Sequence, residues 1–509
     1  MNINLNTLYE DEINKKLLEL YEEGTELFLV GGYIRDFLLN KECFDKDYAV
    51  KGEGAISFAG KAAKAFDGYF VLLDKEHDIA RVVMPDKKNT LDFAGCVGQN
   101  ILTDLKNRDF TINAIACKIE KGKSELIDPL NGIEDLNNKI IRTISEENII
   151  DDSLRVLRAY RFAAQFGFYI ENKTLKLIEK HKSLITMVSI ERITQELIKL
   201  FEGDFAGENL YLMNNSGLLD EIFPELIPQR KVPPNLHHHL GLLEHSIECV
   251  RQIEILISQT VILSEQSERE DLKQQSYSDS HAMALPSLRM TIKNFPDWAK
   301  EHLYREFSSG IKAISLLKLA TLLHDIGKPS TWQIDEEGRH RFIKHEELGS
   351  EMVLDVLKRL KFSKNTMKYI AKLIKYHMYP SQLLHEGIEN LSEKAVMRMF
   401  RRIGDDMPEL ILLAMADRLS AKGSEITDEI VEKNIQGLYF LLEKYKKSQE
   451  EVRTIPKLTD GNEVMEILKI PPSPILGKIL KDLNEAQISG DVNTREDALE
   501  FVKGYKIVN

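Results

Sequence analysis

The nine residues ECFDKDYAV (42–50) constrain this chain more than any other stretch, because they place two aspartates two positions apart among largely apolar neighbours. On a β-strand, side chains i and i+2 point to the same face, so Asp45 and Asp47 would stand side by side. Two like charges on a half-buried strand cost free energy unless a positive group lies against them. The pair therefore predicts a cation site, with a solvated loop as the alternative.

The length of 509 residues is too great for one core and predicts three or four domains. The composition, 43% hydrophobic and 29% charged, is typical of a soluble globular protein, and we find no apolar run near the roughly 18 residues that a membrane span needs. The acidic, amphipathic N-terminus does not resemble a signal peptide. The net charge of −13 excludes a protein coated in positive charge but permits a local basic groove.

The four cysteines are scattered, with no CxxC pair: Cys43, Cys96, Cys117 and Cys249. Such spacing favours reduced thiols in a cytoplasmic protein over disulfides or a zinc site.

Hydrophobic periodicity changes along the chain. Before about residue 145, strand patterns cover 26–32, 44–50, 68–74, 79–84 and 89–94, a helical pattern covers 33–40, and 107–119 fits either structure. Beyond 146 the pattern is nearly all helical, with Ser189 as the N-cap of one helix. Polar breaks predict a surface insertion at about 264–281 and a separate final module. We therefore expect an α+β domain at 1–145, then helical domains at 146–230, 231–445 and 446–509.

The first group of candidate site residues surrounds the aspartate pair. Gly31 and Gly32 lie where a strand turns into a helix, with Arg35 in the first turns of that helix, and this arrangement suits a phosphate. Asp92, in TLDFA, adds a third carboxylate on another strand. Three carboxylates beside a triphosphate fit two Mg²⁺ ions about 3.5–4 Å apart.

The ordered motifs LVGGYIRD, DKDYA, LDFA, DLKNRDFTINA, IDPLNGIEDL, DDSLRVLRAYRF and ERITQEL resemble the class II tRNA nucleotidyltransferase/poly(A) polymerase family over about residues 24–230. The resemblance implies a palm-like nucleotidyltransferase head with a small mixed sheet, followed by an all-α neck, body and tail. It implies CTP and ATP as substrates, Mg²⁺ as the cofactor and the tRNA 3′ end as the acceptor, with no membrane and no DNA as partners. It implies that Asp45 and Asp47 are the metal-binding pair. It also implies that Gly32 and Arg35 bind the phosphates of the nucleotide, and that Arg108 and Asp109 lie at its sugar and phosphate.

The stretch DDSLRVLRAYRF bears on base selection. Its helical spacing predicts one helix, on which Asp152 and Arg155, three residues apart, are neighbours on one face. Aspartate accepts and arginine donates, which matches the exocyclic amine and ring nitrogen of cytosine and adenine but not uracil or guanine. By resemblance, Arg158 and Arg161 also contact the nucleotide. A solvated arginine-rich helix is the alternative.

Three features depart from the family pattern. Asp151 replaces a glutamate, and Asn107 replaces an arginine close to the triphosphate. The segment between Asp47 and Arg108 is also short, and in the family a flexible loop there is associated with the switch from C to A addition. Addition of CC only, of A only, or of poly(A) therefore stays open beside complete CCA addition.

A second group of candidates combines histidines and aspartates on helical segments, in the order His245, His324–Asp325, His345, His377 and Asp417. Mixed imidazole and carboxylate ligands suit Mn²⁺, Fe²⁺, Co²⁺, Ni²⁺ or Mg²⁺. The order resembles the HD phosphohydrolase superfamily over about 236–420, which implies these six residues as metal ligands and Lys328 near a phosphate. A phosphohydrolase that acts on RNA ends or nucleotides, and an HD domain that only binds RNA, are the competing interpretations. The run His237–His238–His239 lies near His245 and offers further candidate ligands, but a solvated loop is the favoured interpretation.

In the final module, Lys478 and Lys481 are three residues apart on a predicted helix and are candidates for RNA phosphate contacts, or else solvated lysines.

Overall fold

The computed structural model describes residues 5–120, 122–236, 238–258, 295–308, 310–454, 458–488, 491–492 and 494–505. The predicted insertion at 264–281 and His237 lie outside the described residues. The chain divides into two compact units, one formed by 1–378 with 412–431 and the other by 379–411 with 432–509.

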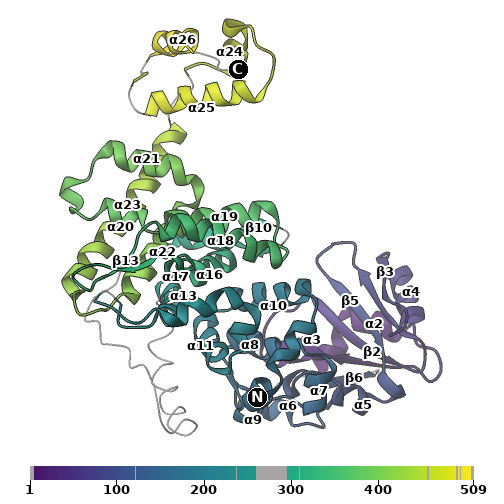
Figure 1. Cartoon of the computed structure of the whole chain (residues 1–509). Coiled ribbons are helices and arrows are strands. Elements are labelled where there is room, and N and C mark those ends of the chain that lie inside the picture. Colours follow the sequence, from purple (N-terminus) through teal and green to yellow (C-terminus); the bar gives the residue numbers. More distant parts are fainter. Residues whose placement is uncertain are drawn as a thin grey trace. The chain divides into compact units, whose positions relative to one another are not determined.

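The N-terminal part of the first unit is a seven-stranded mixed sheet (Figure 1). Its strands in chain order are β1 (Glu26–Val30), β2 (Asp45–Lys51), β3 (Tyr69–Asp74), β4 (Ile79–Val83), β5 (Thr90–Gly95), β6 (Ala116–Glu120) and β7 (Lys123–Ile127). The spatial order is β3-β4-β5-β2-β1-β6-β7, and β2 and β5 are the parallel pair of this sheet. The predicted α+β head with a small mixed sheet is confirmed, as are its first five strands.

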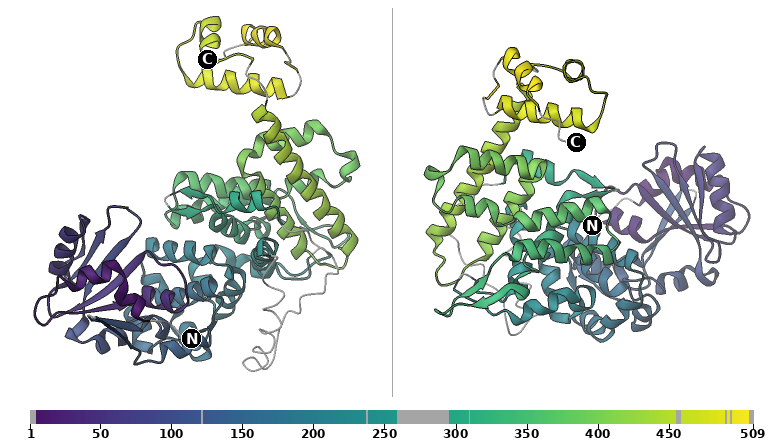
Figure 2. Two further views of the ribbon diagram at one scale, coloured as in Figure 1. Left: turned by 180° about the vertical axis from the view of Figure 1, so that it is seen from behind. Right: turned by 45° about the horizontal axis from the view of Figure 1, so that its top comes forward.

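The two faces of β2 have different neighbours because strand side chains alternate. Tyr48 points to one face, where it stacks on Phe93 with ring centroids 5.1 Å apart and donates to Asn14 of α2 (2.6 Å). The purple N-terminal helices lie along the sheet in both views of Figure 2. Asp45, Asp47 and Ala49 share the opposite face, where Ala49 belongs to a core with Phe28. The aspartates therefore extend from the end of a hydrophobic core.

The helices of the head are α1 (Asn6–Glu10), α2 (Glu12–Leu18), α3 (Gly31–Leu38), α4 (Ala55–Ala65), α5 (Ile101–Lys106) and α6 (Gly132–Asn137). Residues 107–119, which fitted either structure, form a 3₁₀ turn (Thr111–Asn113) and then β6.

The rest of the first unit is mainly helical. Its helices are α7 (Glu146–Asp151), α8 (Arg155–Phe166), α9 (Asn172–His181), α10 (Ile190–Glu202), α11 (Ala206–Ser216), α12 (Leu218–Ile222), α13 (Leu242–Ser258), α15 (Asp297–Leu303), α16 (Ala313–Leu323), α17 (Lys328–Thr331), α18 (His345–Arg359) and α19 (Lys364–Tyr376). Ser189 is the N-cap residue of α10, but its side chain makes no capping hydrogen bond.

Small strand pairs interrupt the region expected to be all helical. They are β8 (Ile140–Ile141) with β9 (Tyr169–Ile170), β10 (Glu306–Ser308) with β11 (Ile311–Lys312), and β12 (Trp332–Ile334) with β13 (His340–Phe342). Strands of two or three residues are too short to show the alternation on which strand prediction depends.

The second unit contains α20 (Tyr379–Leu383), α21 (Glu393–Ile403), α24 (Gly461–Leu468), α25 (Pro474–Ile488) and α26 (Arg495–Lys503). α22 (Met407–Ser420) and α23 (Asp428–Thr454) each run from one unit into the other. The last three helices, α24, α25 and α26, lie within the predicted range of the final module (446–509). In the described part of the chain, no helix has the length and hydrophobicity to cross a bilayer.

Gly132, the first residue of α6, packs against the backbone that leads into β6. A Cβ atom there would lie 2.2 Å from the carbonyl oxygen of Thr111, which is too close for any side chain. The backbone of Gly132, in the motif IDPLNGIEDL, therefore packs directly on the backbone of Thr111, in the motif RDFTINA.

We expect Gly132→Ala to lower the free energy of unfolding by about 1–3 kcal/mol, because the carbonyl cannot withdraw without moving the turn. Gly60→Ala is the control, since Gly60 lies inside α4 with open space at its Cβ position. This change should raise stability by about 0.5–1 kcal/mol. Urea denaturation of both variants measures the difference, and equal midpoints would contradict the proposed clash.

Candidate nucleotide site and candidate metal centre

The three head carboxylates meet at the parallel pair of strands. The register sets Asp45 beside Thr90 and Asp47 beside Asp92. Asp45 is exposed and accepts a hydrogen bond from Thr90 Oγ1 (2.7 Å). Burial and the neighbouring Asp92 raise the pKa of Asp47 to about 6. The predicted cluster is therefore assembled, and its crowded negative charge is what a bound cation relieves.

Asp92 has a partner that the sequence reasoning missed. Arg81 of β4 binds it in bidentate fashion, with Nε–Oδ1 at 2.6 Å and Nη2–Oδ2 at 2.7 Å. The antiparallel register of β4 and β5 places the two residues directly opposite one another. The alternation of IARVV, with Arg81 on the face away from Ala80 and Val82, was the available signal.

The glycine turn adjoins the carboxylates. Gly31 has a φ of +65°, and a Cβ atom there would lie 2.7 Å from Arg108 Nη1 and 3.6 Å from Asp47 Oδ2. Arg108 is held by Asp104, whose Oδ2 accepts from Nε (3.2 Å) and Nη2 (3.0 Å). Gly31, Asp47 and Arg108 thus surround a space that only a residue without a side chain leaves open.

Arg35 and Asp109 lie deeper than a nucleotide-contacting role alone would require. Arg35 is buried, donates to Asn113 Oδ1 (2.7 Å) and to both oxygens of Asp36, and lies 4.7 Å from the Phe166 ring centre. Burial by itself would raise the pKa of Asp109, but the Arg158 guanidinium and the Asn113 amide hold that pKa below its ordinary value. Both charges are already neutralised within the protein.

Glu196 of α10 completes a buried charge network at α8, and it too was missed as a functional residue. It accepts from Arg158 Nη1 (3.2 Å) and Arg161 Nε (2.9 Å), while Arg158 Nη2 donates to Asp109 (2.6 Å). Burial lowers the pKa of Arg161 to about 10 although Glu196 opposes the shift. The network joins α8 to both the head and α10, and its glutamate was visible in ERITQEL.

The prediction that Asp152 and Arg155 share one helix face is wrong. Asp152 follows α7 as its C-cap residue, with an extended backbone (φ −135°, ψ 93°), and α8 begins only at Arg155. A turn connects them, in which the Arg155 N–H donates to the Asp152 carbonyl (3.0 Å). Asp152 Oδ2 accepts from Arg192 Nη2 of α10 (2.9 Å). The two residues remain neighbours, but a turn rather than a helix sets their relation.

Backbone carbonyls fix the Arg155 side chain. Its Nη1 donates to the Asn148 carbonyl (2.9 Å) and its Nη2 to the Asn107 carbonyl (2.7 Å). The buried Asn148 side chain in turn donates to the carbonyls of Lys106 (2.8 Å) and Arg108 (2.6 Å). Asn148 therefore ties the segment carrying Arg108 to the helix that precedes Asp152. Asp151 is the last residue of α7.

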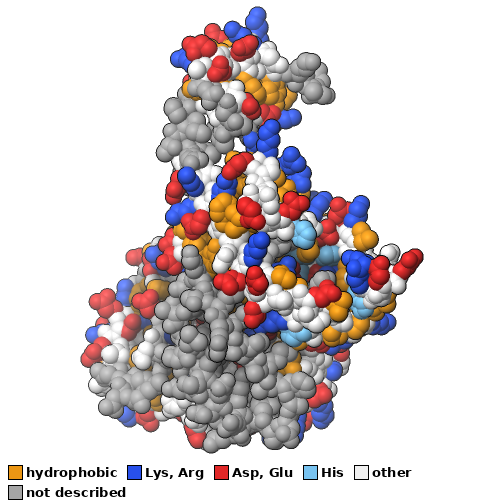
Figure 3. Space-filling view, turned by 90° about the vertical axis from the view of Figure 1, so that its left-hand side faces the viewer, with side chains coloured by type: hydrophobic (Ala, Val, Ile, Leu, Met, Phe, Trp, Pro, Cys, Tyr) orange, Lys and Arg blue, Asp and Glu red, His pale blue; other side chains and the backbone are white. Residues whose placement is uncertain are grey.

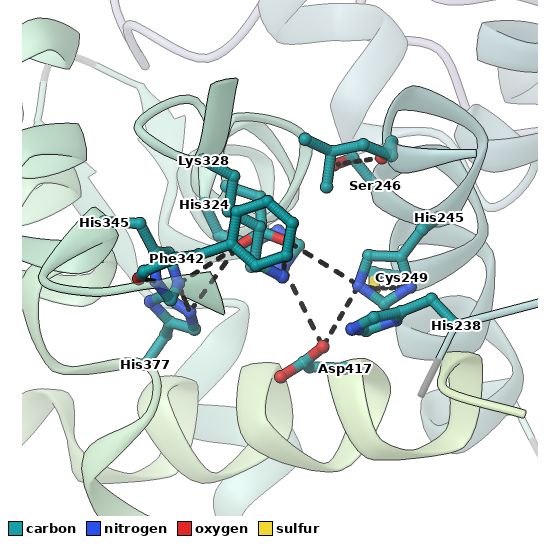
Figure 4. A network of polar contacts seen from close by, with 12 residues as sticks. His238, His245, Ser246, Cys249, His324, Lys328, Phe342, His345, His377 and Asp417 are labelled. Atoms are coloured by element: carbon teal, nitrogen blue, oxygen red, sulfur yellow. Dashed lines mark hydrogen bonds and ion pairs between the residues drawn. The ribbon is translucent and has the colours of Figure 1, made fainter. Parts of the chain in front are cut away.

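The second candidate site brings together all six predicted residues within the first unit. Figure 4 labels five of them, His245, His324, His345, His377 and Asp417. His245 Nε2 lies 3.1 Å from Asp417 Oδ1, and His324 Nε2 lies 3.2 Å from Asp325 Oδ2. On the other side, Asp325 Oδ1 lies 3.3 Å from His345 Nε2 and 3.8 Å from His377 Nε2. Asp325 thus lies between two groups of ligand atoms.

The imidazoles are oriented by backbone carbonyls. Nδ1 of His324, His345 and His377 lies 2.7, 2.8 and 2.7 Å from the carbonyl oxygens of Thr321, Phe342 and Ile374. An N–H donated there leaves each Nε2 lone pair directed into the site, as in many metal centres.

The donor set fits a divalent metal. The side chains of His324, Asp325 and His377 are fully buried, and their ligand atoms lie within 4.8 Å of one another. Such groups are costly unless an ion satisfies them. Lys328 Nζ lies 2.6 Å from Asp325 Oδ2 and offers a positive charge beside the same position.

His238, which the sequence placed in a solvated loop, lies against the site. Its ring centroid is 4.3 Å from that of His245, and burial lowers its pKa to about 2.

In the final module, Lys478 and Lys481 are both exposed on α25.

Three family models match the chain. A poly(A) polymerase head domain matches residues 27–142, a probable RNA and SrmB-binding site of polymerase A matches 167–229, and an HD domain matches 299–422.

Curated relatives cover most of the chain. An A-adding tRNA nucleotidyltransferase of Deinococcus radiodurans is 29% identical over 93% of this chain and 94% of its own. A CC-adding tRNA nucleotidyltransferase of Thermus thermophilus is 29% identical over 94% of this chain and 93% of its own. A CCA-adding enzyme of Enterococcus faecalis is 31% identical over 56% of this chain and 72% of its own.

Among solved structures, the Thermotoga maritima CCA-adding enzyme complexed with tRNA_CCA is similar with a TM-score of 0.55. The likeness covers 97% of this chain and 98% of that one at 20% identity, and it supports the fold.

Replacing Glu196 by alanine should lower the free energy of unfolding by about 3–5 kcal/mol, because Arg158 and the buried Arg161 lose their shared carboxylate. Glu191→Ala, an exposed change on the same helix, should cost less than about 0.5 kcal/mol. Chemical denaturation compares them. A small effect of Glu196→Ala would mean that the network contributes little to stability.

Proposed function

The chain belongs to the tRNA nucleotidyltransferase and poly(A) polymerase family, and we propose that it adds CMP and/or AMP to the tRNA 3′ end from CTP and ATP. The observation that carries this proposal is the cluster of Asp45, Asp47 and Asp92 beside the open glycine turn. Carboxylates beside a glycine turn at the start of a helix are elements that nucleotidyl transfer requires.

Asp45 and Asp47 are the residues that would hold Mg²⁺ in the head. Bound Mg²⁺ supplies activation of the attacking hydroxyl and neutralisation of the leaving pyrophosphate. The turn at Gly31 and Gly32 forms the start of α3, where the first backbone N–H groups of a helix favour an anion. Arg108 provides the positive charge nearest to this turn.

Other arginines position the site. Asp109, Arg158, Arg161 and Glu196 fix α8 against the head, and Arg35 braces α3 through Asn113. We propose that these residues maintain the shape of the nucleotide pocket. We also propose that they contact the nucleotide when it binds.

For base selection we assign the Asp152 carboxylate to the exocyclic amine and the Arg155 guanidinium to the ring nitrogen of cytosine or adenine. Two carbonyls already hold Arg155, so little side-chain entropy is lost when it pairs with a base. Uracil and guanine would leave buried polar groups unpaired, at about 1–3 kcal/mol each.

The extent of addition is the finer part of the proposal. The connection from β5 to α5 spans residues 96–100, so the segment between Asp47 and Arg108 is compact. Relatives named A-adding and CC-adding are equally similar to this chain. We therefore propose complete CCA addition, with addition of CC only or of A only as alternatives. Poly(A) synthesis is a further alternative.

The expected partners are tRNA, CTP and ATP in the cytoplasm, without DNA. On the face drawn in Figure 3, basic and acidic side chains lie interspersed. We assign RNA contacts to local lysines such as Lys478 and Lys481 of the final module. Domain boundaries near 145, 230 and 445 remain part of this proposal.

The metal centre supports a second function. His245, His324, Asp325, His345, His377 and Asp417 would hold one or two ions among Mn²⁺, Fe²⁺, Co²⁺, Ni²⁺ and Mg²⁺. Such ions supply a hydroxide nucleophile at neutral pH. Lys328 would face the phosphate of a phosphomonoester or cyclic phosphodiester. The buried Asp325 carboxylate, which lies between two groups of imidazole nitrogens, favours this function over that of an RNA-binding body alone.

Nucleotidyl transfer is tested with labelled CTP, ATP or both, on tRNA that ends before CCA or after CC, with Mg²⁺. We expect incorporation by the natural chain and loss of at least about 10³-fold in Asp45→Ala/Asp47→Ala. Two C and one A indicate complete addition, and arrest after CC or use of ATP alone indicates a partial enzyme. No incorporation on either acceptor would overturn the proposal.

Arg155→Ala should bring the kcat/KM values for CTP and UTP closer together by about 10-fold or more, because the donor to the ring nitrogen is lost. Arg401→Ala, an exposed change in the second unit, should leave the ratio unchanged. Steady-state kinetics with each nucleotide provides the measurement. Unaltered discrimination in the Arg155 variant would refute its role in base selection.

Phosphohydrolase activity is tested with a 2′,3′-cyclic nucleotide and a nitrophenyl phosphate, with each divalent metal in turn. His324→Ala should abolish hydrolysis without affecting nucleotidyl transfer, because His324 lies in the metal centre and outside the head. The exposed His385→Ala is the matched control. Hydrolysis that survives in the His324 variant would assign the activity to a contaminant.

A further inference from the structure

We propose that Cys249 is a ligand of the metal centre, and that this centre therefore prefers a thiophilic ion, Zn²⁺, Fe²⁺ or Co²⁺, over Mg²⁺. The inference rests on the proposed metal centre and specifies its donor set. Sequence analysis assigned this cysteine only to the scattered reduced thiols.

The fold places Cys249 in the site through α13. His245 and Cys249 are four residues apart, so they share one face of that helix, and both are fully buried. In Figure 4 the sulfur lies directly behind the His245 ring, on the side of the site that also holds Asp417. The helix therefore presents an imidazole and a thiol toward the same point.

The separation of the two donors matches shared coordination. Cys249 Sγ lies 3.5 Å from His245 Nε2. Two ligands of one tetrahedral ion, at metal distances of about 2.3 Å for sulfur and 2.0–2.1 Å for nitrogen, lie about 3.5 Å apart. Ligand atoms of His245, Cys249, His324 and Asp417 all lie within 4.8 Å of one another. These four side chains can surround one ion.

A buried cysteine more often serves as a small apolar side chain. Here, however, its sulfur lies within 4.8 Å of ligand atoms of His245, His324 and Asp417, and both histidines are fully buried. An alanine or valine at 249 would offer no ligand atom to an ion held by these side chains. The surroundings therefore point to a ligand rather than to packing.

The thiol changes which ions the site favours. Mg²⁺ takes oxygen ligands in octahedral geometry and keeps several waters, whereas thiolate with imidazole suits Zn²⁺, Fe²⁺ and Co²⁺. Binding replaces the thiol proton with the metal, and the proton leaves to water. Asp325, His345 and His377 remain for a second, harder ion.

The test uses the full chain, freed of metal with a chelator and titrated anaerobically with Co²⁺, which absorbs in the near ultraviolet when bound to thiolate. We expect this band in the natural chain and in Cys43→Ser, and its loss in Cys249→Ser and Cys249→Val. Zn²⁺ affinity should fall at least about 10-fold in the Cys249 variants. Circular dichroism and tRNA nucleotidyl transfer confirm that each variant is folded.

The outcomes separate this inference from the centre on which it depends. If the natural chain binds more Co²⁺ than His324→Ala but shows no thiolate band, or if the band persists in Cys249→Ser, the ligand role of Cys249 is refuted and the metal centre stands. If the natural chain binds no more Co²⁺ than His324→Ala, the metal centre itself fails, and the inference with it.

Discussion

Repulsion between neighbouring carboxylates is the constraint around which the head is built. The parallel pairing of β2 and β5 sets Asp47 beside Asp92 at the end of a hydrophobic face, and burial there raises the pKa of Asp47 to about 6. The protein compensates only part of this charge, through Arg81 on Asp92 and Arg108 near Asp47. The remaining negative charge favours the binding of a cation. Full neutralisation by arginines would remove this electrostatic driving force.

Arginines in the neighbouring helices serve chiefly to fix the geometry of this site. Arg158 and Arg161 share Glu196, Arg158 also holds Asp109, and Arg35 is enclosed by Asp36, Asn113 and Phe166. Each guanidinium offers several donors in a rigid plane, so one side chain can join two or three elements at once. The positions of α3, α8 and α10 relative to the sheet therefore depend on buried ion pairs.

The second site uses the opposite electrostatic arrangement. Backbone carbonyls orient the imidazoles of His324, His345 and His377, and Asp325 lies against imidazoles and Lys328. Nitrogen and carboxylate ligand atoms therefore converge on one region. In both sites, strands or helices fix the positions of side chains that can act as metal ligands. They differ in ligand chemistry, since the head offers oxygen alone and the HD centre offers nitrogen, oxygen and sulfur, which favours different ions.

The sequence by itself determined the residue types of both sites, the strands and helices that carry them, and the division into an α+β head and a mainly helical remainder, because these follow from local periodicity and ordered motifs. Asp45, Asp47 and the six HD residues were all identifiable in this way. Only the tertiary structure decided that Asp152 lies in a turn, that Arg81 faces Asp92, that Glu196 links two arginines and that Cys249 lies beside His245. Such contacts depend on strand register and on where helices begin and cross, which are set by packing between segments distant in the chain.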